Sequence, residues 1–310
     1  MSHVLTLAAS AALLPDLARA AERIARELGT APGPLDWLDP GRACDLPLAG
    51  EASGALAEGA LERALREVFA GSPVDLAVQP AAGRRKKLLL ADMESTVIAN
   101  EMLEELAEFV GLRERVERIT TRAMNGELDF RASLIERVAL LRGLPEQVLH
   151  DCLELIRFDP GAPALVSTLK AHGVPCALVS GGFTFFAEWV AARVGFEFCC
   201  ANQLQIEDGR LAGTVAEPIL DKGAKLRQLE QLTLERGLLP ADAATVGDGA
   251  NDLPMLLAAG LGVAYHGKPA VAAAARFRVD HGDLTTLLHF QGYRRSEISG
   301  ADSQTQRGPL

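Results

Sequence analysis

The chain has 310 residues and a formal net charge of −10, with 48% hydrophobic and 23% charged residues. This composition is typical of a soluble globular protein, and the length suffices for two domains. The negative charge argues against broad contact with nucleic acid or an acidic membrane surface, and no segment reaches the ~18 apolar residues that a membrane-spanning helix needs.

The first 82 residues predict a small α+β domain. Alternation and helical spacing of apolar residues indicate three short strands and two helices, with the strands at 4–8, 45–47 and 74–78 and the helices at 14–28 and 55–69. Amino-acid-binding regulatory domains have such a pattern. A purely structural appendage fits it equally well, because the segment contains no ligand motif.

Two further features of the chain point to ordinary roles. The basic run Arg84-Arg85-Lys86-Lys87 is expected to be a solvated linker rather than a binding patch. The five cysteines show no C-x-x-C spacing and the six histidines no paired ligand spacing, which argues against zinc. Free thiols in a reducing compartment explain the cysteines best, so we expect a cytoplasmic protein.

A catalytic edge is indicated where the apolar run 88–91 ends in Asp92 and Glu94. The run predicts a buried parallel strand, and open α/β sheets bind ligands at the carboxyl ends of their strands. Two carboxylates there would repel each other unless a cation or a proton intervened. The pair therefore suggests a divalent metal, a nucleophile and an acid/base, although an ordinary strand end would look similar in isolation.

The rest of the chain predicts a helical insertion followed by alternating strands and helices. Helices are expected at 102–109, 112–124, 130–141, 145–156, 161–171, 183–194 and 222–235, and strands at 176–179, 244–246, 263–265 and 277–279. The alternation indicates βαβ units and a parallel sheet. Residues 294–310 are polar and are predicted to be disordered.

Three segments extend the candidate site beyond the first strand. They are Leu178-Val-Ser-Gly-Gly182, Lys225 on a predicted helix, and Ala244 to Asp252, A-T-V-G-D-G-A-N-D. Together with the strand before Asp92, they resemble the four motifs of the haloacid-dehalogenase (HAD) phosphatase superfamily, and over roughly 86–283 its phosphoserine phosphatase branch. The resemblance implies an α/β fold: a Rossmann-like HAD core with a parallel sheet over 83–293, and an inserted helical cap at about 101–157.

The resemblance also implies the roles of the charged residues. Asp92 would be the nucleophile, and it would hold Mg²⁺ together with Asp248 and the backbone carbonyl of Glu94. Lys225 would stabilise both the phosphate and Asp92, and it fits the family pattern better than the nearby Lys222.

The remaining motif residues are implied to bind substrate or to support those that do. Ser180 and the backbone amide of Gly181 would bind a phosphoryl oxygen, and Asn251 would contact phosphate or substrate. Asp252 would position Lys225 or a metal-bound water. One residue departs from the family pattern, because Glu94 stands where Asp is usual. We expect Glu94 to keep the acid/base role, with rate and leaving-group preference open to change.

Specificity is expected to come from the cap. The resemblance maps recognition of an ammonium group to Glu101 and of a carboxylate to Arg137, which suits their chemistry. Two surface helix charges would give the same sequence pattern. Met124 and Phe130 could line the pocket or merely pack within the cap.

The leading hypothesis is Mg²⁺-dependent hydrolysis of O-phospho-L-serine through an aspartyl-phosphate, the final step of serine biosynthesis. The alternatives are a phosphatase or phosphotransferase for another small phosphorylated amino acid, such as phosphohomoserine, and a catalytically weak amino-acid sensor. The expected partner is a small molecule, without nucleic acid or membrane, and a homodimer is possible.

Overall fold

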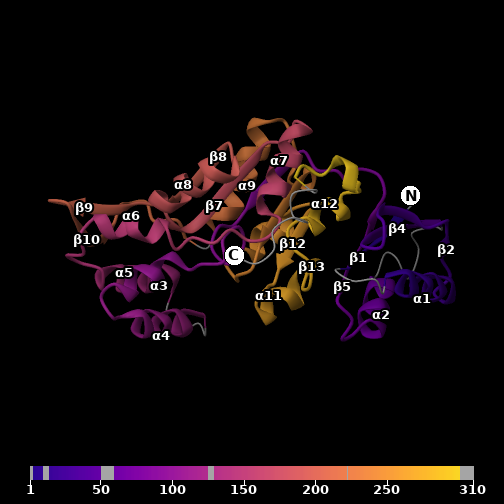
Figure 1. Cartoon of the computed structure of the whole chain (residues 1–310), viewed down its shortest axis with the longest axis horizontal. Coiled ribbons are helices and arrows are strands. Elements are labelled where there is room, and N and C mark those ends of the chain that lie inside the picture. The colour runs from indigo at the N-terminus through magenta and orange to yellow at the C-terminus, as the bar shows by residue number, and fades with distance from the viewer. Residues whose placement is uncertain (1–2, 10–13, 50–58, 125–128, 222, 301–310) are drawn as a thin grey trace.

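The computed structural model describes residues 3–9, 14–49, 59–124, 129–221 and 223–300. Their strands form a six-stranded parallel sheet, a five-stranded antiparallel sheet and a two-stranded hairpin. Figure 1 shows the antiparallel sheet at one end of the molecule, the parallel sheet in the middle and a group of helices with the hairpin at the other end.

The parallel sheet has the strand order β13-β12-β11-β6-β7-β8. Its strands are β6 (Leu88–Ala91), β7 (Cys176–Phe183), β8 (Phe198–Asn202), β11 (Ala243–Gly247), β12 (Leu261–Tyr265) and β13 (Phe277–Val279). Leu90 of the central β6 is in register with Ala177 on one side and Thr245 on the other. The predicted parallel sheet is thus confirmed, and the carboxyl ends of β11, β6 and β7 are neighbours.

Helices cover both faces of this sheet because successive strand residues point in opposite directions. Leu89 and Ala91 share a hydrophobic cluster with α7 (Ala162–Ala171), α8 (Thr184–Val194) and α12 (Thr286–Phe290). Leu88 and Leu90 share another with α9 (Ala224–Glu235), α10 (Leu253–Ala258) and α11 (Pro269–Ala274). A strand buried on both faces explains the continuous apolar run in the sequence.

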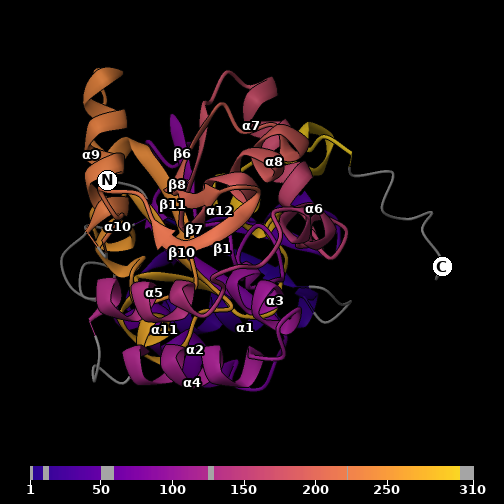
Figure 2. The same ribbon diagram turned by 90° about the vertical axis from the view of Figure 1, so that its left-hand side faces the viewer.

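The helical insertion contains α3 (Met102–Glu108), α4 (Arg113–Met124), α5 (Phe130–Ala139) and α6 (Gln147–Leu153). The sequence did not predict that a hairpin, β9 (Leu204–Glu207) and β10 (Arg210–Val215), joins them. The backbone of Leu211 bonds to Gly143 and Leu144, both at 2.8 Å. Figure 2, viewed from this end, shows α3, α4 and α5 grouped below β10. We call these helices and the hairpin the cap.

The antiparallel sheet has the order β2-β4-β1-β5, with β3 paired to β4. Its elements are β1 (His3–Ala9), α1 (Leu14–Glu27), β2 (Ala31–Pro32), β3 (Asp36–Asp39), β4 (Ala43–Ala49), α2 (Ala60–Val68) and β5 (Val74–Pro80). Leu5 and Leu46 pack with α1 and α2 in a separate hydrophobic cluster. Buried polar residues of β5, Asp75 and Gln79, bond instead to the remainder of the protein. Residues 55–58 of the predicted second helix lie outside the described residues.

The basic run is largely the solvated linker that the sequence predicts, because the Arg85 and Lys87 side chains are 45% and 64% exposed, but its residues also form ion pairs. The Arg84 guanidinium lies 2.5 Å from an Asp45 oxygen, and Lys87 lies 3.1 Å from Asp242. Arg85 bonds to Glu297 at 2.8 Å. The acidic partners are far apart in the sequence, so the run joins the antiparallel sheet to the rest of the protein.

The chain after Arg294 also differs in part from its prediction. A 3-10 turn spans Arg295–Glu297, and Arg294 lies 2.7 Å from Asp36. These contacts order residues up to 300, whereas 301–310 lie outside the described residues. No described helix combines the length and the hydropathy needed to cross a bilayer. All five cysteines are free thiols.

Candidate active site

Polar side chains gather where three adjacent strands of the parallel sheet end. Asp92 follows β6, Ser180 and Gly181 lie in the last part of β7, and Asp248 follows β11. Because the strand order is β11-β6-β7, these residues meet at one edge of the sheet. Lys225, in the first turn of α9, reaches the same place.

Lys225 is the electrostatic centre of this group. Its Nζ lies 2.7 Å from Asp92 Oδ1 and 2.5 Å from Asp252 Oδ1. Burial opposes its charge, but the carboxylates of Asp252 and Asp92 outweigh burial and raise the pKa of Lys225. The other oxygen of Asp252 accepts a hydrogen bond from the Gly249 amide at 2.8 Å. Asp252 is therefore bonded through both oxygens, in a position to fix Lys225.

Three carboxylates could hold a metal ion here. Asp92, Asp248 and Asp252 offer oxygens that lie within 4.8 Å of one another. Since Asp252 is engaged on both sides, Asp92 and Asp248 are the better ligands. Burial, more than the neighbouring carboxylates, raises the pKa of Asp92 well above its usual range and that of Asp248 to about 6. A divalent cation would stabilise both as anions, and hard oxygen ligands suit Mg²⁺.

The backbone of Gly181 is fixed by Asn202, a residue that the sequence did not reveal. The Asn202 side chain donates to Gly181 O at 2.8 Å and accepts from Leu220 N at 2.8 Å. Ser180 Oγ accepts a hydrogen bond from Gly182 N at 2.9 Å. Asn202 thus ties the end of β8 to β7 and to the segment before α9, both of which line the pocket.

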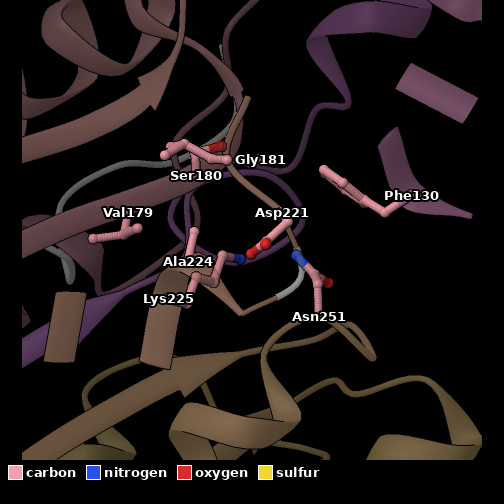
Figure 3. A pocket seen from close by; sticks show the side chains of 9 residues that line it. Phe130, Val179, Ser180, Gly181, Asp221, Ala224, Lys225 and Asn251 are labelled. Carbon is pink, nitrogen blue, oxygen red and sulfur yellow. The ribbon is translucent and has the colours of Figure 1, made fainter. Parts of the chain in front are cut away.

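The pocket itself lies between the sheet edge and the cap. It is lined by residues from both, namely Phe130, Val179, Ser180, Gly181, Leu220, Asp221, Ala224, Lys225 and Asn251. Figure 3 shows Phe130, from α5, facing Ser180 and Gly181 across the pocket. Phe130 therefore lines the pocket, which was one of the two roles that the sequence allowed for it, the other being packing within the cap. The side chain of Met124 and all of Lys222 lie outside the described part of the chain.

Glu94 lies where the core meets the cap. Its Oε1 accepts a hydrogen bond from Met102 N at 2.8 Å. A Cβ added to Gly182 would lie 2.7 Å from Glu94 Oε2, so the glycine makes room for this side chain. Burial, reinforced by Glu101, raises the pKa of Glu94 to about 8. Burial thus favours the protonated form of Glu94.

The two expected specificity residues belong to the cap side of the site. Glu101 Oε1 accepts a hydrogen bond from Ser95 Oγ at 2.7 Å. Arg137 donates to Ser133 O at 3.2 Å and to Thr120 Oγ1 at 3.1 Å. Burial lowers the pKa of Arg137, and the carboxylates of Glu94 and Glu101 oppose that shift. The carboxylates of Glu94 and Glu101 therefore favour the charged form of Arg137.

A second cation at the site escaped sequence reasoning. Lys268 Nζ lies 3.2 Å from Asp248 Oδ2, and its backbone amide donates to Asp248 O at 3.0 Å. Burial opposes the charge, but Asp248 raises the pKa of Lys268. One signal could have found it: Lys268 follows the carboxyl end of β12, the neighbour of β11.

Comparison with known proteins finds a matching family model and several similar sequences. Residues 89–257 match the model of the haloacid dehalogenase-like hydrolase family. The chain is 42% identical over 66% of its length to a phosphoserine phosphatase of Lactococcus lactis, 95% of which is covered. It is 41% identical over 79% of its length to the phosphoserine phosphatase SerB2 of Mycobacterium tuberculosis.

The fold similarity extends over the whole chain. The crystal structure of a probable phosphoserine phosphatase from Vibrio cholerae superposes on it with a TM-score of 0.74 and 30% identity. The match covers 99% of this chain and 89% of the Vibrio cholerae chain. The chain spans only 60% of the length of the Mycobacterium tuberculosis protein and of a Streptomyces coelicolor relative.

Proposed function

We propose that this chain, which belongs to the haloacid dehalogenase-like hydrolase family, is a Mg²⁺-dependent phosphatase that hydrolyses O-phospho-L-serine to serine and phosphate. The observation that carries the proposal is the buried pair Asp92 and Asp248 at adjacent strand ends, together with Lys225 of α9, which lies 2.7 Å from Asp92. The names of the similar proteins support the substrate.

Asp92 would act as the nucleophile. A carboxylate oxygen of Asp92 attacks phosphorus, and the bond from phosphorus to the serine oxygen breaks, leaving an aspartyl-phosphate. Lys225, already 2.7 Å from Asp92, offsets negative charge on the phosphoryl oxygens. Ser180 and the Gly181 amide would bind one of these oxygens. When bound by Asp92, Asp248 and the Glu94 carbonyl, Mg²⁺ would supply charge neutralisation for the phosphoryl group.

Glu94 would move the protons. It donates a proton to the departing serine oxygen in the first step. In the second step its carboxylate accepts a proton from the water that attacks phosphorus, and the bond from phosphorus to Asp92 breaks. Its position between the sheet edge and the first cap helix supports this role, since the serine part of the substrate would lie on the cap side.

The cap would read the amino acid. Arg137 offers a guanidinium for the carboxylate of phosphoserine, and Glu101 offers a carboxylate for its ammonium. Glu101 raises and Arg137 lowers the pKa of Glu94, which supports placing the serine part of the substrate beside these three residues.

Phosphate release from a panel of phosphomonoesters tests the proposal. Phosphoserine, phosphothreonine, phosphohomoserine and phosphoethanolamine are compared with and without Mg²⁺. We expect phosphoserine to have the highest kcat/KM and turnover to require Mg²⁺. A preference for phosphohomoserine would reassign the substrate, whereas an absence of release from every ester would contradict a phosphatase.

A further inference from the structure

The loop of residues 266–268 fixes Asp248 from outside the recognised motifs. Lys268 contacts Asp248 twice, through Nζ at 3.2 Å and through its backbone amide at 3.0 Å. The amide bond holds the Asp248 backbone and the Nζ contact holds its carboxylate, so a shift of this loop would disturb both. The position of the loop therefore matters to any metal held by Asp248.

His266 anchors this loop to the segment after β13. Its backbone amide donates to Val279 O at 2.8 Å, and its ring Nε2 lies 3.1 Å from Gly282 O. A carbonyl only accepts, so Nε2 is assigned the proton in this contact. His266 has a φ of +42°, a conformation that residues other than glycine adopt only when their surroundings impose it.

The segment after β13 is held in turn by Asp75 of β5. The Asp75 carboxylate accepts hydrogen bonds from the amides of Asp280 at 2.7 Å, His281 at 3.2 Å and Gly282 at 2.7 Å. Asp75 is only 3% exposed. Gly282 thus bonds to Asp75 through its amide and to His266 through its carbonyl.

We propose that the antiparallel sheet helps to set the metal affinity of the active site, because Asp75 positions Asp248 through residues 280–282 and the 266–268 loop. Asp75 and His266 are positioning residues, and neither contacts the reacting groups. The inference rests on the metal-dependent function proposed above. It gives the N-terminal region a role in catalysis that requires no ligand of its own.

The structure offers a matched control on the same strand. Gln79 of β5 is 2% exposed and donates to Phe290 O at 2.6 Å. It thereby joins the antiparallel sheet to α12 rather than to residues 280–282. Asp75→Asn and Gln79→Met each disturb one buried contact of β5. Only the contact of Asp75 is connected to Asp248, through residues 280–282 and the 266–268 loop.

The test is Mn²⁺ binding to the 310-residue chain without substrate, with the free ion measured by electron paramagnetic resonance. We expect Asp75→Asn and His266→Asn to weaken Mn²⁺ binding by about 10-fold, the lower end for residues that orient metal ligands. Asparagine suits position 266 because it tolerates a positive φ. Because the two residues act in series, the double variant should be no weaker than the weaker single variant. Gln79→Met should bind Mn²⁺ within about twofold of wild type, an allowance for an ordinary buried contact.

A second readout separates positioning from general damage. The Mg²⁺ concentration for half-maximal activity should rise in both variants, while kcat at saturating Mg²⁺ stays near the wild-type value. Wild-type Mn²⁺ affinity in a folded Asp75→Asn or His266→Asn variant would overturn the inference. So would an equal loss in Gln79→Met. Absence of Mn²⁺ binding by the wild type would instead remove the proposed metal-dependent function, and the inference with it.

Discussion

The Glu94 carboxylate accepts a hydrogen bond from the backbone amide of Met102, with 2.8 Å between Oε1 and N. Met102 is the first residue of α3, so the candidate acid/base of the core is bonded to the first helix of the cap. The positive end of a helix stabilises a carboxylate. Any movement of α3 away from the core would break this bond and change the charge environment of Glu94.

Glu94→Gln should slow hydrolysis by about 10²–10⁴-fold, the usual effect of losing a general acid/base group. Glu94→Asp should retain more activity, because a carboxylate remains although it is one methylene shorter. Mg²⁺ affinity should change less, since the proposed metal contact is the backbone carbonyl. Steady-state kinetics at several Mg²⁺ concentrations measure both effects. A fully active Gln variant would assign the proton transfers to another group.

Gly182→Ala should slow turnover, by up to about 10²-fold for a misplaced catalytic group. The added Cβ would lie 2.7 Å from Glu94 Oε2 and displace that carboxylate. In a Glu94→Asp background the shorter side chain leaves room, so the same change should cost less. The comparison is kcat for the four combinations. Equal proportional losses in both backgrounds would mean that Gly182 acts independently of residue 94.

Arg137→Ala should lower kcat/KM for phosphoserine by roughly 10- to 150-fold, corresponding to about 1.5–3 kcal/mol for a charge-assisted contact. Phosphoethanolamine, which lacks the carboxylate, should be almost unaffected. Glu101→Gln should erode the preference for phosphoserine over phosphoglycolate, which lacks the ammonium. Equal losses on all three compounds would show that these residues support the cap instead of reading the substrate.

His289 should make the protein less stable in mild acid. Burial lowers the pKa of His289, although its contact with the Tyr293 carbonyl opposes the shift. The unfolded chain therefore binds a proton more readily than the folded one, and stability is lost as pH falls below about 6.5. Urea unfolding at about pH 7.5 and pH 5 should show a smaller decrease for His289→Gln than for wild type. Identical decreases would exclude a contribution from this residue.

Local patterns predicted much of the fold. The apolar runs before Asp92 and Asp248 identify buried parallel strands, and the polar residues that end each run mark the edge where they meet. The expected strand at 277–279 coincides with β13. Such features depend only on neighbouring residues and on the geometry of parallel sheets.

Features that arise from long-range contacts were missed. Asn202 matters because it reaches Gly181 and Leu220, and Lys268 because β12 pairs with β11. The ion pairs of the basic run were also missed, because partners such as Asp45 and Glu297 are distant in sequence. Periodicity within a segment carries no information about such partners.

The central claim is that Asp92 carries the phosphoryl group during turnover. The direct measurement is rapid acid quenching of excess enzyme mixed with phosphoserine and Mg²⁺, followed by peptide mass spectrometry. We expect a transient phosphoryl group on Asp92 in wild type, and neither this adduct nor turnover in a folded Asp92→Asn variant verified to be free of deamidation. A phosphoryl group on another residue, or near-native turnover by Asp92→Asn, would contradict the claim.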